Sequence, residues 1–332
     1  MEPFLQETKS LRHTGSWEWI MANKEATRFG FYEGLVELAK EHSNIYALDA
    51  DLAKTTGSVA FQKAFPERYI DVGIAEQNMV GISAGLSKVG IVPFCSSMAV
   101  FAVGRAFEII RNGVAYSRLN VKIVGSHGGI TAAGDGGSHQ CVEDVGVMRS
   151  LPNMVVLQPC DSNQARLIAR MAYEHNGPVY IRTSREPMEN ITSQTDSIEL
   201  GKIQTLVEGK DLCIVASGMM TCLAKQALDI LKENGVGASL VNVHTIKPFD
   251  TDGIVSAVKK CGGKVLVCEE SNVVCGLTEA VASSLVEENG IKISHVAIED
   301  RFGQSGATAE LLEAYGITKE NIAKKAMELH RR

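Results

Sequence analysis

The sequence predicts an α/β protein with two domains, each built on a mostly parallel sheet that helices cover. Short apolar runs alternate with segments of helical periodicity along most of the chain, as in parallel sheets buried on both faces. One polar, turn-rich stretch, residues 184–197, interrupts this alternation. The length of 332 residues also suits two domains better than one.

The first predicted domain covers residues 24–190 and follows an N-terminal extension, residues 1–23, whose role the pattern leaves open. A helix is expected to begin at Lys24, and another follows Asp161, a good N-cap residue. Strands are expected where short apolar runs occur: residues 45–48, 69–72, 91–94, 121–124, 154–157 and 179–182. In open parallel sheets, ligands bind beyond the carboxyl ends of such strands.

The polar stretch predicts a linker over residues 191–209, because turn-forming residues replace the periodic pattern there. A second, smaller α/β domain is expected over residues 210–332. Its strands are expected at residues 212–216, 238–243, 264–268 and 293–298, with helical stretches between them.

The composition of the chain argues against several classes of function. A net charge of -6 and a pI near 5.8, without a basic run that contains aromatic residues, argue against a nucleic-acid partner. No apolar run approaches the roughly 18 to 20 residues of a membrane span, and no secretory signal is recognisable, so we expect a cytoplasmic protein. The eight cysteines never form a C-x-x-C pair and are interpreted as reduced, mostly buried thiols.

Residues 71–85, DVGIAEQNMVGISAG, place an acidic residue at the turn between a short strand and a helix. Gly73 lets the backbone turn, and Met79 and Ile82 then recur at helical spacing. Glu76 therefore lies at a helix N-terminus, where the helix dipole stabilises negative charge. The spacing alone favours a first-turn acid that stabilises the helix over a functional carboxylate.

A glycine-rich loop, residues 125–140 (GSHGGITAAGDGGSHQ), follows another predicted strand. Its composition suits a loop that lines a site better than a core. An isolated loop histidine is usually solvated. His127, Asp135 and His139 occur together beyond a strand end, however, so a functional site is an equal alternative to a solvated loop.

Three parts of the sequence resemble the transketolase family. The run GIAEQNM, residues 73–79, resembles the signature of the transketolase pyrimidine-binding domain, and the glycine-rich loop resembles a segment that ends in Asp-Gly-x-x-His-Gln. Residues 216–218, 245–250 and 303–306 resemble, in order, the transketolase C-terminal domain. Over about residues 24–330, the resemblance implies a thiamine-diphosphate-binding fold followed by a C-terminal domain that serves mainly dimer contacts.

The resemblance implies catalytic roles for Glu76, His127 and His139. Glu76 matches a glutamate that hydrogen-bonds a ring nitrogen of the cofactor's aminopyrimidine and shifts its amino group to the imino form. His127 matches a histidine that contacts the sugar phosphate, and His139 one that binds near the cofactor amino group and the nascent carbonyl. Asp135 matches a residue that reads the hydroxyl configuration of the donor sugar.

Further residues match positions near the cofactor ring. Met98 and Phe101 are three residues apart, which predicts one helix face, and they match positions that stack on the pyrimidine. Such a pair is more often plain core. Methionine stands where phenylalanine is usual, although its sulfur can pack on a ring, and Gly104 supplies no aromatic group. Asp51 and Ile74 also match positions near the ring.

Arg28, Thr55 and Arg185 match family positions that bind the anionic substrate. Singly, each arginine is more often a surface residue. A guanidinium suits a phosphate or another tetrahedral anion such as a sulfonate, so the head group stays open. The glycine-rich loop departs from the family at Gly134 and Gly137, where many relatives have glutamate and either proline or alanine, which leaves loop rigidity and substrate preference open.

Residues 134–136 with Asn163 formally satisfy the Gly-Asp-Gly…Asn pattern by which thiamine-diphosphate enzymes hold magnesium. We reject this match, because Asn163 lies just inside the helix that Asp161 caps, after an intervening helix and strand. No metal ligand is therefore assigned to this chain. The resemblance implies that Mg²⁺ and the diphosphate are held mainly by a separate N-terminal transketolase subunit, in an α2β2-type heterotetramer.

The resemblance implies transfer of a two-carbon ketol unit from an anionic ketose, for which phosphate is the first expectation, to an aldose, with thiamine diphosphate as cofactor. The nearest alternative is the beta subunit of a two-oxo-acid dehydrogenase, which shares this domain pair, although the loop and the arginine positions favour sugars. A decarboxylating synthase of the same cofactor class would normally be one longer chain. A non-catalytic regulatory subunit is suggested by Met98 and Gly104, and the presence of Glu76 argues against it.

Overall fold

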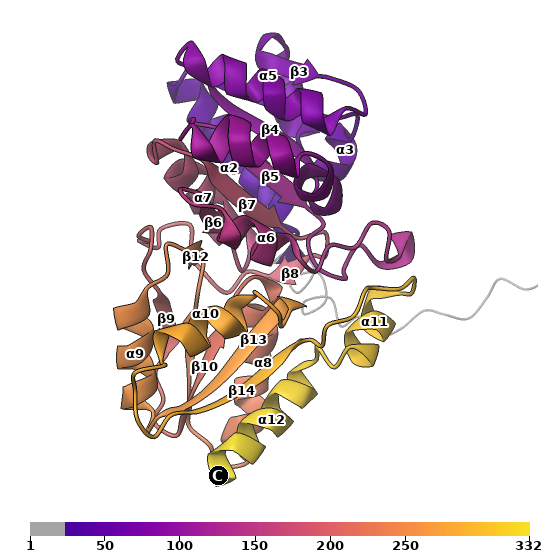
Figure 1. Ribbon diagram of the computed structural model, residues 1–332. Helices are drawn as coiled ribbons and strands as arrows, with labels where there is room; N and C mark the ends of the chain where they lie inside the picture. Colours follow the sequence, from indigo (N-terminus) through magenta and orange to yellow (C-terminus); the bar gives the residue numbers. More distant parts are fainter. Residues whose placement is uncertain (1–23) are drawn as a thin grey trace, which may run out of the picture.

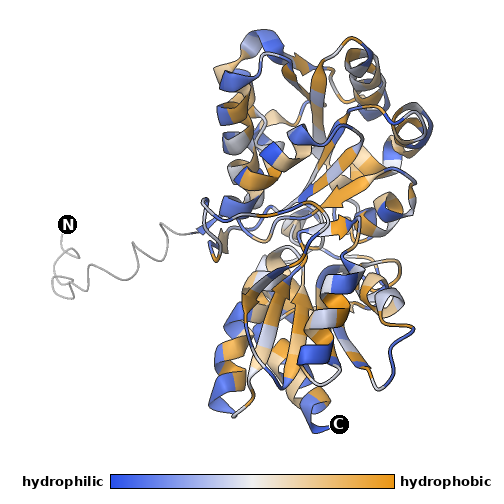
Figure 2. Ribbon diagram, turned by 90° about the vertical axis from the view of Figure 1, so that its left-hand side faces the viewer, coloured by the Kyte–Doolittle hydropathy of each residue, from blue (hydrophilic) through white to orange (hydrophobic). Residues whose placement is uncertain are grey.

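The computed structural model describes residues 24–332, so the predicted N-terminal extension lies outside the described residues. The chain forms two α/β halves, one above the other in Figure 1, and each half has a central sheet packed between helices. In Figure 2 the strands are mostly hydrophobic, whereas the outer helices carry hydrophilic faces. This arrangement confirms the predicted fold class.

Within the described chain, the first sheet has seven strands in the order β12-β6-β7-β5-β4-β2-β3. Strands β2 to β7 pair in parallel, whereas β12 runs antiparallel to β6. Every residue of β4, β5 and β7 is buried, so both faces of the sheet centre are covered. The strands are β2 (Ile45–Asp49), β3 (Tyr69–Asp71), β4 (Val92–Met98), β5 (Lys122–Ser126), β6 (Val155–Leu157), β7 (Val179–Thr183) and β12 (Thr245–Lys247).

The position of β12 differs from the prediction, because its residues belong to the segment assigned to the second domain. It adds an antiparallel edge strand to the first sheet. Lys247 fixes it there, since its Nζ donates to the carbonyl oxygens of Arg149 (2.8 Å) and Leu151 (2.5 Å). The two halves are therefore joined through a sheet edge as well as through the chain.

Helices cover both faces of the first sheet, an apolar core lies beneath each layer, and one of these cores continues into the second half. The helices α2 and α7 pack against each other on one face, and α5 packs with the π-helical segments η2 and η3 on the other. The helical elements are α2 (Thr27–Glu41), α3 (Ala53–Thr56), α4 (Val59–Ala64), η1 (Pro66–Arg68), α5 (Glu76–Lys88), η2 (Val100–Arg105), η3 (Ile109–Tyr116), α6 (Asp144–Ser150) and α7 (Ser162–Glu174).

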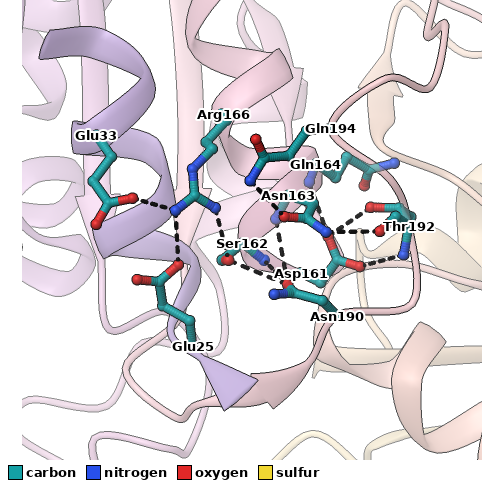
Figure 3. Close-up of polar contacts among 10 residues, drawn as sticks. All are labelled: Glu25, Glu33, Asp161, Ser162, Asn163, Gln164, Arg166, Asn190, Thr192 and Gln194. Carbon is teal, nitrogen blue, oxygen red and sulfur yellow. Dashed lines mark hydrogen bonds and ion pairs between the residues drawn. The ribbon is translucent and has the colours of Figure 1, made fainter. Parts of the chain in front are cut away.

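The first helix begins at Thr27, so the prediction of a helix from Lys24 was wrong at this boundary. Lys24–Glu25 form strand β1, which pairs antiparallel with β8 (Met188–Glu189), a partner far away in the sequence. Arg166 of α7 stabilises this two-stranded pair through an ion pair, because its Nη2 lies 3.3 Å from Glu25 Oε2. The same atom also pairs with Glu33 of α2 (Figure 3). Because a distant segment defines strand β1, no local hydrophobic period in the sequence indicates it.

Asp161 caps α7, as the sequence predicted, since its Oδ1 accepts the N–H of Gln164 at 2.8 Å. Its Oδ2 accepts the N–H groups of Ile191 and Thr192, both at 2.7 Å. Figure 3 shows the contacts of Asp161 with Gln164 and Thr192, which hold the chain after β8 at the start of α7. The first part of the predicted linker is therefore anchored to the first half.

The second sheet of the described chain has the order β14-β13-β10-β11-β9, parallel except for β9. Strand β9 lies inside the predicted linker, residues 191–209, which is therefore partly an edge strand of this sheet. The strands are β9 (Gln204–Val207), β10 (Leu212–Ala216), β11 (Ala238–Asn242), β13 (Lys264–Asn272) and β14 (Lys292–Ile298). The helices are α8 (Met219–Glu233), α9 (Thr251–Lys260), α10 (Leu277–Ser284), α11 (Thr308–Ala314) and α12 (Lys319–Arg331).

Two expectations from composition can be compared with the structure. All eight cysteines lie in the described part of the chain, and seven of them are buried while Cys275 is exposed, which confirms that most of them are buried. Along residues 24–332, no helix combines the length and the apolar character that a bilayer crossing needs.

Candidate functional site

The predicted site residues follow the carboxyl ends of parallel strands in the first sheet. Asp51 comes after β2, Glu76 after β3, His127 after β5 and Arg185 after β7. These strands pair in parallel, so their carboxyl ends meet at one edge of the sheet, where ligands bind in open α/β sheets. Arg28 reaches the same region from the first turn of α2.

Glu76 is the first residue of α5 and only 2% exposed. The backbone turns into this helix at Gly73, whose φ of +70° favours glycine. Oε2 of Glu76 lies 3.5 Å from Nη1 of Arg105, and within the described chain no hydrogen bond reaches this oxygen. A buried carboxylate oxygen without a donor is costly. Glu76 therefore differs from a solvated first-turn acid.

Arg105 lies beside Glu76 in this candidate site, although no motif in the sequence marks it. It lies on η2, half-exposed, and its guanidinium carbon is 6.0 Å from the centroid of the Phe101 ring. The Phe101 ring in turn meets the His139 imidazole edge-on, with centroids 5.3 Å apart. Glu76, Phe101 and His139 are thus brought together as a first group.

Met98 does not share a helix face with Phe101, so that prediction was wrong. Met98 is the buried last residue of β4, and Phe101 lies in η2 immediately after it. The strand runs farther than its predicted end at Phe94 because the following serines are buried. Ser96 accepts a hydrogen bond from the Tyr32 hydroxyl at 2.6 Å inside the sheet.

Arg28, His127 and Arg185 form a second group. Nη1 of Arg28 donates to the carbonyl oxygens of Ser184 (3.3 Å) and Arg185, and Nη1 of Arg185 donates to that of Ala132 (2.6 Å). Burial, and then the neighbouring Arg185 charge, lowers the pKa of Arg28 to about 10. Two guanidinium groups so close repel each other, and a bound anion would offset that repulsion.

His127 has an unusual backbone and an uncharged ring. Its φ of +61° lies in the left-handed region, which is uncommon for histidine and often marks functional positions. The ring is buried, and Nδ1 lies 2.7 Å from the hydroxyl of Ser126. Burial, with the charges of Arg28 and Arg185, lowers the pKa of His127 to about 3. The imidazole is therefore neutral near pH 7.

Asp135 joins the second group through an ion pair, since its Oδ2 lies 3.1 Å from Nη1 of Arg185. It ends the 3-10 turn η4 (Ala133–Asp135) of the glycine-rich loop. Gly134 faces open space, so no neighbour requires a glycine there. A Cβ on Gly137, in contrast, would come within 2.5 Å of the carbonyl oxygen of Gly303. Gly137, one of the two loop positions that differ from the family, thus lies in close contact with the second half.

Three predicted residues lie at the same sheet edge but outside both groups. Asp51 is exposed with φ +62°, and its N–H donates to Oδ1 of Asp71 at 3.0 Å. Thr55 is half-buried in α3, and Ile74 is 74% exposed beside Glu76. The structure gives them no contact that reveals a role.

Asn163, which formally completes the Gly-Asp-Gly…Asn pattern, has its own partners. Its Nδ2 donates to the Thr192 carbonyl oxygen at 2.8 Å, and its Oδ1 accepts from Gln194 at 3.1 Å (Figure 3). Asp135 instead pairs with Arg185 on the glycine-rich loop. The two residues of the formal pattern therefore belong to different parts of the first half.

The chain matches two protein-family models, "Transketolase, pyrimidine binding domain" over residues 23–189 and "Transketolase, C-terminal domain" over residues 201–322. It is 45% identical over 305 residues to a "Putative transketolase C-terminal section" of Methanocaldococcus jannaschii, a match that covers 91% of this chain and 95% of that protein. It is 42% identical over 298 residues to the "6-deoxy-6-sulfo-D-fructose transketolase subunit SqwH" of a Clostridium species, covering 90% and 92% of the two chains.

Among solved structures, "Split gene transketolase, inactive beta4 tetramer" superposes with a TM-score of 0.85 at 44% identity, covering 92% of this chain and 98% of that one. The chain therefore belongs to the transketolase family, of which it carries the pyrimidine-binding and C-terminal domains, and nearly its whole length matches a chain of a split-gene member.

Proposed function

We propose that this chain is the C-terminal subunit of a two-chain transketolase, which transfers a two-carbon ketol unit from an anionic ketose to an aldose. The proposal rests on one observation: a buried carboxylate group and a cationic group lie at the same edge of one sheet. The carboxylate is Glu76, and the cations are Arg28 and Arg185. The relatives that are named as a C-terminal section and as a subunit support the split arrangement.

The residues around Glu76 fit the aminopyrimidine of thiamine diphosphate. Oε2 of Glu76 is buried without a hydrogen-bond donor in the described chain, so it can share a proton with a ring nitrogen. Phe101 offers a half-buried aromatic face that could stack on the ring, and His139, at its edge, could hydrogen-bond the amino group. When bound, thiamine diphosphate supplies a nucleophilic carbon and an electron sink. Met98 and Asp51 are proposed to lie near the same ring.

The second group is proposed to hold the sugar. Arg28 and Arg185 offer guanidinium donors, and neutral His127 offers an N–H without adding a third positive charge. Asp135, held by Arg185, can accept from a sugar hydroxyl, and Thr55 adds a hydroxyl at the rim. A phosphate and a sulfonate are both tetrahedral anions that suit these donors. One relative is named for a sulfo sugar.

A separate N-terminal chain is proposed to complete the site. Ile74 is a large apolar side chain that is 74% exposed, two residues before the buried Glu76. A partner that covers it would also cover the start of α5, where Glu76 lies. That partner would bring the Mg²⁺ and diphosphate contacts, in an α2β2-type assembly.

The proposal is tested by co-expressing this chain with the N-terminal transketolase chain of the same organism. The purified complex is assayed for ketol transfer with thiamine diphosphate and Mg²⁺, using phosphorylated and sulfonated ketoses, and each chain alone serves as a control. We expect turnover only with both chains. Activity of this chain alone would contradict the split-enzyme proposal. Turnover of two-oxo acids in place of sugars would support a dehydrogenase beta subunit instead.

A further inference from the structure

The glycine-rich loop lies against the second half of the molecule, although that half contributes no predicted site residue. A bridge closes the loop at its base, where the N–H of Gly129 donates to the Cys141 carbonyl oxygen at 2.6 Å and the reverse bond spans 3.2 Å. Residues 130–140 beyond the bridge carry Asp135 and His139. In Figure 1 this part of the loop extends toward α11, with which η4 is in contact.

Glu270, on β13 of the second sheet, holds the start of this loop. Its Oε1 accepts the N–H groups of Ile130 (3.0 Å) and Thr131 (3.2 Å), and the side chain is 2% exposed. The approach is so close that a Cβ on Gly129 would come within 2.3 Å of the Glu270 carboxylate, and Gly129 also has φ +83°. A glycine is required at 129 because the carboxylate from the other half occupies that space.

A second contact holds the end of the same loop. Nε2 of Gln140 donates to the carbonyl oxygens of Ala133 (3.1 Å) and Gln304 (2.9 Å), so it links the loop to itself and to the second half. Gly137 packs on the carbonyl oxygen of Gly303 nearby. The segment with Asp135 and His139 is therefore held at both ends by the second half.

Glu270 is itself held in place by Arg182, the fourth residue of β7. The Arg182 guanidinium donates to the Glu270 carbonyl oxygen (2.9 Å) and to Ser271 Oγ (2.9 Å). It also pairs with buried Asp144, Nε to Oδ2, at 3.1 Å. Buried, multiply bonded groups of this kind have little freedom to move. Glu270 thus presents a fixed acceptor to the loop.

We propose that Glu270 is a positioning residue, through which the second half holds Asp135 and His139 of the glycine-rich loop in the geometry that the substrate needs. The effect on substrate rests on the function proposed above, whereas the effect on the loop does not. Because Glu270 is buried, it would act on the substrate only through the loop, by way of the N–H groups of Ile130 and Thr131. His127, which precedes the bridge and follows β5 directly, depends on it less.

Hydrogen–deuterium exchange of the isolated chain tests the loop contact directly. Glu270→Met keeps the length of the side chain and removes the acceptor, so the amides of Ile130 and Thr131 are expected to exchange about tenfold faster or more. Glu270→Gln retains an acceptor oxygen and is expected to restore most of the protection. Unchanged exchange in Glu270→Met would overturn the proposal.

Glu269→Met is the matched control. Glu269 is the neighbouring buried carboxylate on β13, but it accepts the N–H groups of Leu277 (2.7 Å) and Thr278 (2.8 Å) at the start of α10. This variant is expected to release those two amides and to leave Ile130 and Thr131 protected. Equal release of the loop amides in both variants would show general loosening and would overturn the assignment.

In the two-chain enzyme, Glu270→Met is expected to lower kcat about tenfold or more, Glu270→Gln to recover most of it, and Glu269→Met to retain it. A loss of kcat that Glu270→Gln does not recover, or that Glu269→Met reproduces, would contradict a positioning role.

If Glu270→Met does not fold, Gln140→Met removes the second contact, and faster exchange of the His139 and Gln140 amides is then expected. Absence of ketol transfer in the wild-type complex would contradict the proposed function. The hydrogen–deuterium exchange result would still show whether Glu270 holds the loop.

Discussion

Glu76 is the residue on which the proposed chemistry depends most directly. Glu76→Gln keeps the size of the side chain but removes the carboxylate that would share a proton with the cofactor ring. We expect ketol transfer to fall by about 10²- to 10⁴-fold. The free energy of unfolding should fall by no more than about 1 kcal/mol, since the ion-pair partner, Arg105, is half-exposed at 3.5 Å. Steady-state kinetics and urea denaturation measure the two effects.

Glu67→Gln is the control for that substitution, because Glu67 is an exposed acid of the same domain that lies 3.5 Å from Arg68. Its removal should leave turnover unchanged. A Glu76→Gln enzyme with full turnover would remove Glu76 from the proposed mechanism.

His127 is expected to bind the substrate anion as a neutral donor. Its pKa is about 3, so its charge does not change between pH 6 and 8. His127→Asn should raise the KM for the ketose about 10- to 100-fold, as expected for a lost hydrogen bond to a charged group, with a smaller effect on kcat. His295→Asn, on β14 of the second sheet, is the control. A wild-type KM that rises through pH 6.5, and no longer does so in His127→Asn, would show that a charged imidazole binds instead.

At the scale of elements, Asp161 links helix α7 to the chain that leaves the first half. Asp161→Ala removes the helix cap and the acceptor of two further N–H groups, so it should lower the free energy of unfolding by about 2 to 4 kcal/mol. Asp161→Asn keeps Oδ1 as the cap but replaces Oδ2, so about half of that loss is expected. Urea denaturation distinguishes the two. Asn163→Ala, a neighbour on α7, should cost less than about 1 kcal/mol, and a larger loss there than in Asp161→Ala would refute this account.

Most central elements could be predicted from the sequence, and the edges could not. Strands β2, β5, β7, β10 and β13 carry apolar runs that are readable because both faces are buried. Strands β1, β9 and β12 have two to four residues each, and distant partners define them. The end of β4 was missed because its buried serines look like turn residues. A short edge strand has no local signature of its own.

At the scale of the whole molecule, the sequence predicted which strand ends carry the candidate site residues but not what holds those residues in place. Motifs identified His127 and His139, because their residue types and spacing are local. Arg105 and Glu270 could not be found in this way. Their importance comes from contacts across 29 residues (105 and 76) and across 140 residues (270 and 130). Such contacts exist only after the sheets are assembled.

The pair of buried carboxylates on β13 should make the stability of the molecule depend on pH. Burial raises the pKa of both Glu269 and Glu270 to about 7, from an ordinary value of 4.5. Below pH 4.5 both carboxyls are protonated in the folded and unfolded chain. As the pH rises toward 7 the unfolded chain loses these protons first, so the folded state loses stability, by on the order of 3 kcal/mol for each residue.

The side chain at position 270 stays neutral at every pH in the Glu270→Gln variant. This variant should therefore keep the stability that the wild type loses when Glu270 must ionise. Measured by urea denaturation at pH 5.5 and pH 8, the stability of Glu270→Gln relative to wild type should therefore increase by about 1 to 3 kcal/mol at the higher pH. Glu287→Gln, at an exposed position, should show no such shift. A relative stability of Glu270→Gln that stays constant, or falls, between these pH values would mean that Arg182 and the loop N–H groups hold Glu270 ionised throughout this range, with burial outweighed by its charge partners.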